Sequence, residues 1–503
     1  MLDWLAHRAR ISANSLALIY ADECWTYAAL NDFVARTAGR LVTAGVRRGQ
    51  RVAVLMPNRS EYAALIHALA RLGAILVPLN TRLTESELGW QADDADCAWV
   101  ICSRETEGKG ATLVGGNRQI FSVDLPHSPV VKALADFAAV DVGLPEFDLD
   151  TVQGIIYTSG TTGRPKGARL TFGNHLWGAM ASAYRLGTLP ADRWLACMPL
   201  YHVGGQAIIL RCCLYGTTVI LQSGFETEAV SRALDNQQVT LLSVVPTMLH
   251  RLLEFRNEQP FPSTLRYVLL GGAGASAPLL DRCRALGVPV ALTYGLTEAA
   301  SQVATATPDQ VRRKPGSVGK PLMFVEARIV DGEGRELPFG QIGEIVVSGP
   351  TVMQGYHQAA QALFAGKLHT GDLGYVDEEG DLWVIQRRTD LIVTGGENVY
   401  PAEVEAVLLA HPGVREACVI GIPDPEWGQS VAAVVVSKAS DLTERNLIGF
   451  CRERLAGYKL PRVMLFVDLL PQTALGKVDR EAAKVLLKES VRHGNFCFTG
   501  IPD

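Results

Sequence analysis

The sequence lacks the features of a membrane protein and of a nucleic-acid-binding protein. No stretch reaches the roughly 18 consecutive apolar residues that a membrane-spanning helix needs. The formal net charge is −5, so a basic surface that binds nucleic acid is not expected. Apolar residues make up 48% of the chain and charged residues 20%, which argues against extensive disorder. We therefore expect a soluble protein with no nucleic-acid partner and no membrane span.

Zinc-site spacing and a secretory signal are also missing. The ten cysteines are scattered, without a CxxC pair or a cysteine–histidine cluster, and only Cys212 and Cys213 are adjacent. Residues 1–4 read MLDW, with no charged segment leading into an apolar run. Because disulfides are rare where thiols are kept reduced, we expect free cysteines and a cytoplasmic location. Nothing in the sequence argues for or against a homo-oligomer.

The first part of the chain alternates between short apolar runs and helical patterns. A chain of 503 residues is too long for one hydrophobic core, so several domains are expected. Apolar runs occupy 51–56, 74–79, 98–102, 217–221, 240–245 and 265–270, and helical periodicity occupies 61–72 and 227–235. Up to about residue 315, this pattern predicts an α/β fold with doubly wound parallel sheets covered by helices on both faces.

The pattern changes twice after this region. Short strands separated by tight turns, at 325–330, 343–348, 374–376 and 382–385, predict antiparallel hairpins and a small β-barrel. Beyond Arg387, helices at 401–410 and 444–456 accompany strands at 417–420 and 430–437, which predicts a small α+β domain. We expect a large N-terminal domain over 1–387 and a small C-terminal domain over 388–503.

A loop rich in glycine and hydroxyl side chains follows the apolar pair Ile155-Ile156. Residues 157–167 read YTSGTTGRPKG. Its expected phosphate-binding residues are Thr158, Ser159, Gly160, Thr161, Thr162, Gly163 and Lys166. Glycines let backbone N–H groups turn inward, hydroxyls add donors and the lysine adds positive charge. The loop is not a Walker A motif, because GxxxxGK[ST] is absent. A Gly/Ser/Thr cluster alone would be a surface loop, but the whole string is much more specific.

Four further strings follow downstream. They read YGLTE at 294–298, TGD at 370–372, GGENVYPAEVE at 395–405 and PQTALGKV at 471–478. With the loop at 157–167, they resemble the motifs of the adenylate-forming superfamily of acyl-CoA synthetases, luciferases and peptide-synthetase adenylation domains. The resemblance covers essentially the whole chain in family order and spacing. It implies a ligase that uses ATP to form an acyl-adenylate and then a thioester of coenzyme A.

The resemblance also implies roles for the first two of these strings. Tyr294 would pack on the adenine, Thr297 would contact the α-phosphate, and Glu298 would hold Mg²⁺ together with Thr158. A lone Thr-Glu pair would more often be the start of a helix. The predicted roles of Thr297 and Glu298 therefore depend on the match of the whole pentapeptide. Asp372 would accept hydrogen bonds from the ribose hydroxyls, although a turn aspartate is the alternative.

The last two strings lie in the expected C-terminal domain, which in the family rotates between the two half-reactions. Arg387 would be a second ribose contact, and Gly395 and Gly396 would let the backbone approach the pantetheine channel. Lys477 would be the catalytic lysine, which stabilises negative charge in the adenylation transition state. The chain departs from the family at the hinge, where Thr389 replaces an Asp or Lys; this leaves hinge energetics open.

Two regions would shape the acyl pocket. His202 resembles the residue that gates the carboxylate site, and Gly271, Gly272 and Ala273 leave room for a flat ring, with Gly272 also near the nucleotide. Ser301 would also contact the substrate. Arg211 lies in an apolar helix, so it either snorkels to the surface or anchors an anion.

The finer resemblance concerns the acid. LLGGAGA at 269–275, TYGLTEAASQ at 293–302 and the segment 372–405 are similar to the o-succinylbenzoate–CoA ligases of menaquinone and phylloquinone synthesis. Those enzymes have a basic residue at the position of Arg211 that binds a substrate carboxylate; which of the two carboxylates it meets here stays open. Another short aromatic or dicarboxylic acid, such as malonate or benzoate, is the alternative, and an adenylate-only enzyme is a second one.

Overall fold

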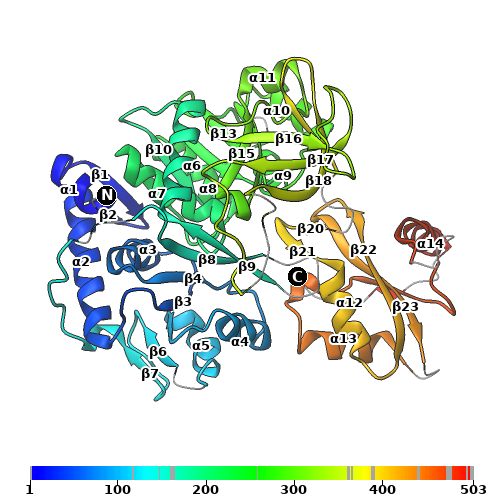
Figure 1. The fold of residues 1–503 in the computed structure, drawn as a ribbon, viewed down its shortest axis with the longest axis horizontal. Helices are drawn as coiled ribbons and strands as arrows, with labels where there is room; N and C mark the ends of the chain where they lie inside the picture. Colours follow the sequence, from blue (N-terminus) through cyan, green and yellow to red (C-terminus); the bar gives the residue numbers. More distant parts are fainter. Residues whose placement is uncertain are drawn as a thin grey trace. The chain divides into compact units, whose positions relative to one another are not determined.

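The computed structural model divides into two units, each with its own core (Figure 1). It describes residues 3–115, 118–144, 146, 148–158, 165–257, 259–358, 363, 366–386, 391–438, 442–471, 478–493 and 497–498. The first unit comprises Met1–Thr81, Ala92–Tyr157 and Gly167–Gln386; the second comprises Arg82–Gln91, Thr158–Lys166 and Arg387–Asp503. The division at 386/387 lies one residue before the expected boundary. That the second unit includes 82–91 and 158–166 was not predicted.

Two large sheets carry the first unit. One has the strand order β7-β6-β5-β3-β4-β8-β9, with the pairs from β7 to β8 parallel. Its strands are β3 (Arg51–Leu55), β4 (Ile75–Pro78), β5 (Trp99–Cys102), β6 (Gln119–Ser122), β7 (Val131–Ala133), β8 (Val152–Thr158) and β9 (Lys166–Thr171). Helices of this part are α1 (Trp4–Ile11), α2 (Tyr27–Ala44), α3 (Ser60–Leu72) and α5 (Glu107–Thr112), whereas most of α4 (Glu85–Asp94) belongs to the second unit.

The second large sheet has the order β15-β14-β13-β12-β10-β11-β1-β2. Its strands are β1 (Leu16–Tyr20), β2 (Glu23–Thr26), β10 (Arg193–Ala196), β11 (Thr218–Leu221), β12 (Leu241–Val244), β13 (Tyr267–Leu270), β14 (Val290–Leu296) and β15 (Ser301–Ala306). The inner pairs are parallel, as predicted, but β2 and β15 are antiparallel to β1 and β14. Short connections cause this exception, because a parallel neighbour needs a long crossover.

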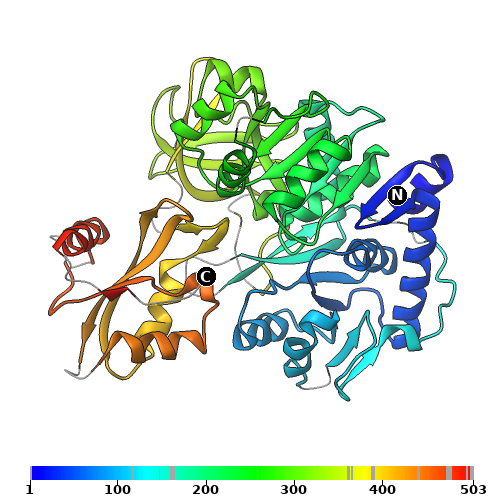
Figure 2. The same cartoon turned by 180° about the vertical axis from the view of Figure 1, so that it is seen from behind.

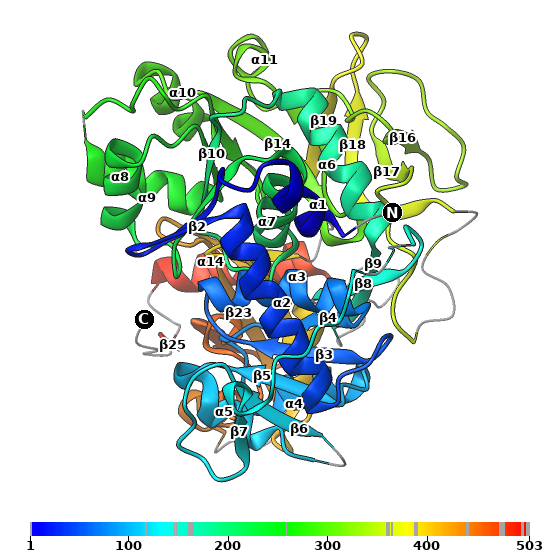
Figure 3. The same ribbon diagram turned by 90° about the vertical axis from the view of Figure 1, so that its left-hand side faces the viewer.

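Helices cover both faces of this sheet. Neighbouring strand residues point to opposite faces: Leu242 packs with α8, α9 and α10, whereas Leu241 joins the core of α2, α3 and α7. The helices are α6 (Phe172–Leu186), α7 (Val203–Tyr215), α8 (Thr227–Asn236), α9 (Pro246–Arg256), α10 (Ala277–Ala285) and α11 (Pro308–Arg313). The core of α2, α3 and α7 also includes strand residues of the first sheet, so the two sheets share it. Helices α8–α10 are green in Figure 2, and Figure 3 shows the side on which α1 and α2 lie.

A smaller antiparallel sheet follows in the first unit. Its order is β16 (Glu326–Val330), β17 (Gly343–Ser348), β18 (Leu368–Val376) and β19 (Leu382–Gln386). A tight turn at Glu379-Gly380 joins the last two strands, with Gly380 at φ 83° and its N–H donating to the Asp377 carbonyl at 2.8 Å. The four strands form half a barrel: among the described strands no pairing between β16 and β19 closes it.

The second unit is an α+β body around a hairpin longer than predicted. Its strands are β20 (Ile392–Thr394), β21 (Glu397–Val399), β22 (Val414–Asp424), β23 (Gly428–Ser437), β24 (Val463–Phe466) and β25 (Cys497–Phe498). One face of β22–β23 packs on α12 (Pro401–Leu409) and α13 (Glu444–Arg452), and the other packs on α14 (Arg480–His493) (Figure 1). Among the described helices of either unit, none is long and apolar enough to cross a membrane.

Candidate active site

Two motif strings meet in the first unit through one hydrogen bond. The Tyr294 hydroxyl, on β14, donates to Asp372 Oδ2, on β18, at 2.6 Å, and both residues are buried. The backbone N–H of Asp372 donates to Thr370 Oγ1, whose hydroxyl donates to the Ile345 carbonyl at 2.6 Å. The tyrosine expected beside the adenine and the aspartate expected on the ribose therefore orient one another.

The turn after Tyr294 requires glycine at position 295. A Cβ there would lie 1.7 Å from the Ser301 carbonyl oxygen, because the β14–β15 ladder has an irregularity at this point. The turn continues through a short 3₁₀ segment, Thr297–Ala299, into Ala300 (φ 51°) and Ser301 (φ 101°). Side chains rarely adopt such backbone angles, and they occur most often at functional sites. Thr297, Glu298 and Ser301 are thus held in one tight turn.

We expect Gly295→Ala to destabilise the protein strongly. The added methyl must push the two strands apart, so the free energy of unfolding should fall by about 1–3 kcal/mol or more. Denaturant unfolding followed by circular dichroism measures this loss. Gly224→Ala is the matched control, since its Cβ would meet nothing within 4 Å; equal stability of the two variants would contradict the requirement.

The side chain of Glu298 has a partner that the sequence did not indicate. The Tyr356 hydroxyl donates to Glu298 Oε1 at 2.7 Å, and the Met353 N–H donates to the Glu298 carbonyl at 2.8 Å. Tyr356 belongs to no motif string, so only folding shows the contact. Among the described residues there is no group of three or more His, Cys, Asp or Glu side chains that could hold a metal ion. Glu298 would therefore contribute to a Mg²⁺ site largely made of other ligands, as phosphate-bound Mg²⁺ prefers.

The glycines after β13 form an open stretch of backbone beside β14. A Cβ at Gly271 would lie 2.6 Å from Thr293 Cγ2, and Gly272 has φ 81°. Gly271 and Ala273 are half-buried and Gly272 is exposed. These three residues follow the carboxyl end of a parallel strand, where ligands of α/β folds bind. That these residues line the acyl pocket stays a prediction.

Helix α7 carries the two remaining predicted side chains. His202 precedes the helix, and its carbonyl accepts from the Gly205 and Gln206 N–H groups at 3.1 Å. Arg211 is only 3% exposed, which excludes the surface-snorkelling alternative. Within the described parts of the chain, its guanidinium has no hydrogen bond or ion pair, and burial lowers its pKa. Burial of a charge without a partner is unfavourable, so an anion bound beside Arg211 would stabilise its charged form.

The remaining predicted residues belong to the second unit or lie outside the described residues. Thr158 Oγ1 donates to the Lys166 carbonyl at 3.4 Å, across the base of the phosphate loop. Gly395 and Gly396 have φ of 57° and 86°, and a Cβ at Gly395 would lie 2.7 Å from the Trp427 ring. The positions outside the described residues are Ser159, Gly160, Thr161, Thr162, Gly163, Arg387, Thr389 and Lys477.

Comparisons with known proteins agree with this arrangement. The family model of AMP-binding enzymes matches residues 5–357, and the model of their C-terminal domain matches residues 403–477. A 2-succinylbenzoate–CoA ligase of Bacillus mycoides is 43% identical over 493 residues, which cover 97% of this chain and 99% of that protein. The enzyme of Bacillus cereus (strain Q1) is 42% identical over the same lengths.

Solved structures lead to the same family. A double mutant of o-succinylbenzoate CoA synthetase from Bacillus subtilis, bound to its product analogue OSB-NCoA, has a TM-score of 0.90 at 38% identity, covering 96% of this chain and 98% of that one. The same enzyme in complex with the acyl-adenylate intermediate OSB-AMP has a TM-score of 0.74 at 39% identity, with the same coverage. This chain belongs to the 2-succinylbenzoate–CoA ligases, within the family of AMP-binding enzymes.

Proposed function

We propose that this chain converts 2-succinylbenzoate, ATP and coenzyme A to 2-succinylbenzoyl-CoA, AMP and pyrophosphate, in menaquinone or phylloquinone biosynthesis. Among the structural observations, Arg211 supports this acid best, because it is a buried cation with no partner among the described side chains. A dicarboxylic substrate supplies the missing anion, whereas an aliphatic acid with a single carboxylate does not. The strong similarity to 2-succinylbenzoate–CoA ligases over 97% of the chain supports the same substrate.

In the first half-reaction, a carboxylate oxygen of the acid bonds to the α-phosphorus of ATP as the bond to the bridging oxygen breaks and pyrophosphate leaves. Tyr294 and Asp372 hold the adenosine, and Thr297 contacts the α-phosphate. Lys477 stabilises the negative charge that develops as the carboxylate attacks the α-phosphate. Mg²⁺, held by Glu298 and Thr158, would neutralise phosphate charge. The phosphate loop at 158–166 binds the departing phosphates through N–H groups, hydroxyls and Lys166.

In the second half-reaction, the sulfur of coenzyme A bonds to the acyl carbon, its proton is lost and AMP leaves. Gly395 and Gly396 would line the approach of the pantetheine arm, since both adopt backbone angles that favour glycine. The other adenylation residues would lie within 1–387, and the lysine would lie within a mobile domain over 388–503. A cytoplasmic location belongs to the same proposal; the nine cysteines whose state the structure describes are all free.

A panel of acids tests the proposed substrate. We expect thioester formation, measured by liquid chromatography of acyl-CoA, to be fastest with 2-succinylbenzoate and much slower with benzoate, malonate and a long-chain fatty acid. Preference for malonate or for the fatty acid would overturn the assignment. Single-turnover assays with ATP and acid, with and without coenzyme A, separate a ligase from an adenylate-only enzyme: only a ligase converts the adenylate to thioester when coenzyme A is added.

A further inference from the structure

Helix α6 carries a buried histidine that no motif includes. His175 lies in the first turn of the helix, is 5% exposed, and has no hydrogen-bond partner for Nε2 among the described groups. A buried polar atom without a protein partner costs about 1–3 kcal/mol, unless water or a ligand completes it.

The face of α6 that carries His175 is directed at the proposed active site. Gly178 lies three residues later and therefore on the same helix face. A Cβ at Gly178 would lie 3.5 Å from the carbonyl oxygen of Ala300, in the strained turn after Glu298. Ala181 of α6, Val203 of α7 and Ala300 belong to one hydrophobic cluster, which also includes Tyr294. Helix α6, helix α7 and this turn thus converge.

His175 is also an electrostatic neighbour of Arg211. Burial, and then the charge of Arg211, lower the pKa of His175 to about 4. The imidazole is therefore neutral at pH 7 and carries one N–H that can donate. One of these buried neighbours is cationic and the other neutral, and neither the Arg211 guanidinium nor His175 Nε2 has an acceptor among the described residues. A carboxylate accepts several hydrogen bonds and would complete both.

From this juxtaposition we propose that His175 is a specificity-determining residue, which donates from Nε2 to the same substrate carboxylate that Arg211 pairs with. This inference rests on the proposed function and extends it, because it assigns a second donor to the carboxylate that does not react. A dicarboxylic acid would be held at one end by Arg211 and His175, while its other carboxylate meets ATP.

Two acids and two variants test the role of His175. The acids are 2-succinylbenzoate and 4-oxo-4-phenylbutanoate, which lacks only the ring carboxylate. For His175→Leu we expect KM for 2-succinylbenzoate to rise about 10- to 100-fold with little change in kcat, as loss of one hydrogen bond to a charged group predicts. The kcat/KM for 4-oxo-4-phenylbutanoate should stay within about 3-fold of wild type. His175→Gln keeps an amide N–H donor and should restore most of the affinity.

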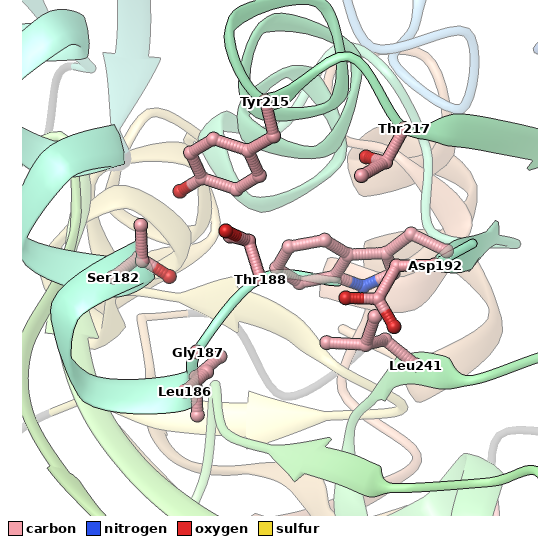
Figure 4. A pocket seen from close by; sticks show the side chains of 10 residues that line it. Ser182, Leu186, Gly187, Thr188, Asp192, Tyr215, Thr217 and Leu241 are labelled. Carbon is pink, nitrogen blue, oxygen red and sulfur yellow. The ribbon is translucent and has the colours of Figure 1, made fainter. Parts of the chain in front are cut away.

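Ser182→Ala is the matched control on the same helix. Ser182 is buried and lines a small pocket with Tyr215, Trp194 and Leu241 (Figure 4). Trp194 and Leu241 lie in the amino-terminal halves of β10 and β12, at the edge of the sheet opposite to Gly271. This variant should leave both acids unaffected.

Each outcome decides between the two proposals. An unchanged KM in His175→Leu, or an equal loss with both acids, would overturn the role of His175 but leave the proposed function intact. An equal effect of Ser182→Ala would show that α6 acts only through packing, which also overturns it. A wild-type protein that is inactive on 2-succinylbenzoate would instead overturn the proposed function and, with it, this assignment.

Discussion

Replacing Lys477 by alanine is expected to abolish adenylation and largely to spare the transfer of a supplied acyl-adenylate to coenzyme A. In the proposed role, the ammonium would stabilise charge that builds only as the carboxylate attacks the α-phosphorus, so its loss should lower kcat of the first step by about 100- to 1,000-fold or more. The second half-reaction develops its charge at the acyl carbonyl instead. Rapid-quench measurements of each half-reaction separate the two effects.

A second lysine provides the control for this prediction. Lys484 lies on α14 and forms an ion pair with Glu481 at 2.6 Å, with the carboxylate largely exposed. Because exposed ion pairs contribute little, Lys484→Ala should keep both half-reactions near wild type. Lys477→Ala with unimpaired adenylation, or with both half-reactions lost equally, would refute the assigned role.

Replacing Arg211 by leucine should produce an unusual combination: a large loss of activity without a loss of stability. Pairing of a buried guanidinium with a carboxylate contributes about 3–5 kcal/mol when one partner is removed, so kcat/KM for 2-succinylbenzoate should fall about 100- to 1,000-fold or more. The free protein, in contrast, loses an unpaired buried charge, so its free energy of unfolding should stay the same or rise.

Arg256 is the matched control, because it is also 3% exposed but is paired. Its guanidinium donates to both oxygens of Asp235, at 2.9 and 3.1 Å. Arg256→Leu leaves that carboxylate, which is 33% exposed, without its cation and should lower the free energy of unfolding by about 1–3 kcal/mol, while substrate preference is retained. Denaturant unfolding of both variants, together with kinetics on the two acids, checks the contrast. Strong destabilisation by Arg211→Leu would show that this arginine has a structural partner.

The same kinetics identify the carboxylate that Arg211 holds. If Arg211 holds the ring carboxylate, Arg211→Leu and wild type should have similar kcat/KM values for 4-oxo-4-phenylbutanoate. If it holds the aliphatic carboxylate, both acids should lose activity together. The comparison therefore decides the point that the sequence left open.

Local pattern alone predicted several strands and helices, and the resemblance of five strings to a known family predicted the roles of the motif residues. Strand β17 begins and ends at the predicted residues, and α12 and β11 differ from the predicted bounds by one residue at one end. These features depend on neighbours in the sequence: the apolar period sets strand or helix, and glycine permits turns such as 379–380. The antiparallel β2 and β15 were missed, because pairing direction depends on connections and not on strand composition.

Burial of the residues proposed for the acyl site depends on the tertiary structure. From the sequence, Arg211 was either a surface cation or a buried anchor, and only packing between the two sheets removes it from solvent. His175 and Tyr356 could not be predicted, since their relevant neighbours, Arg211 and Glu298, are distant in the sequence. The sequence by itself thus determined which chemistry the chain carries, through strings that bind phosphate and nucleotide. Which polar groups are buried without a partner depends on long-range contacts, and those appear only when the chain is folded.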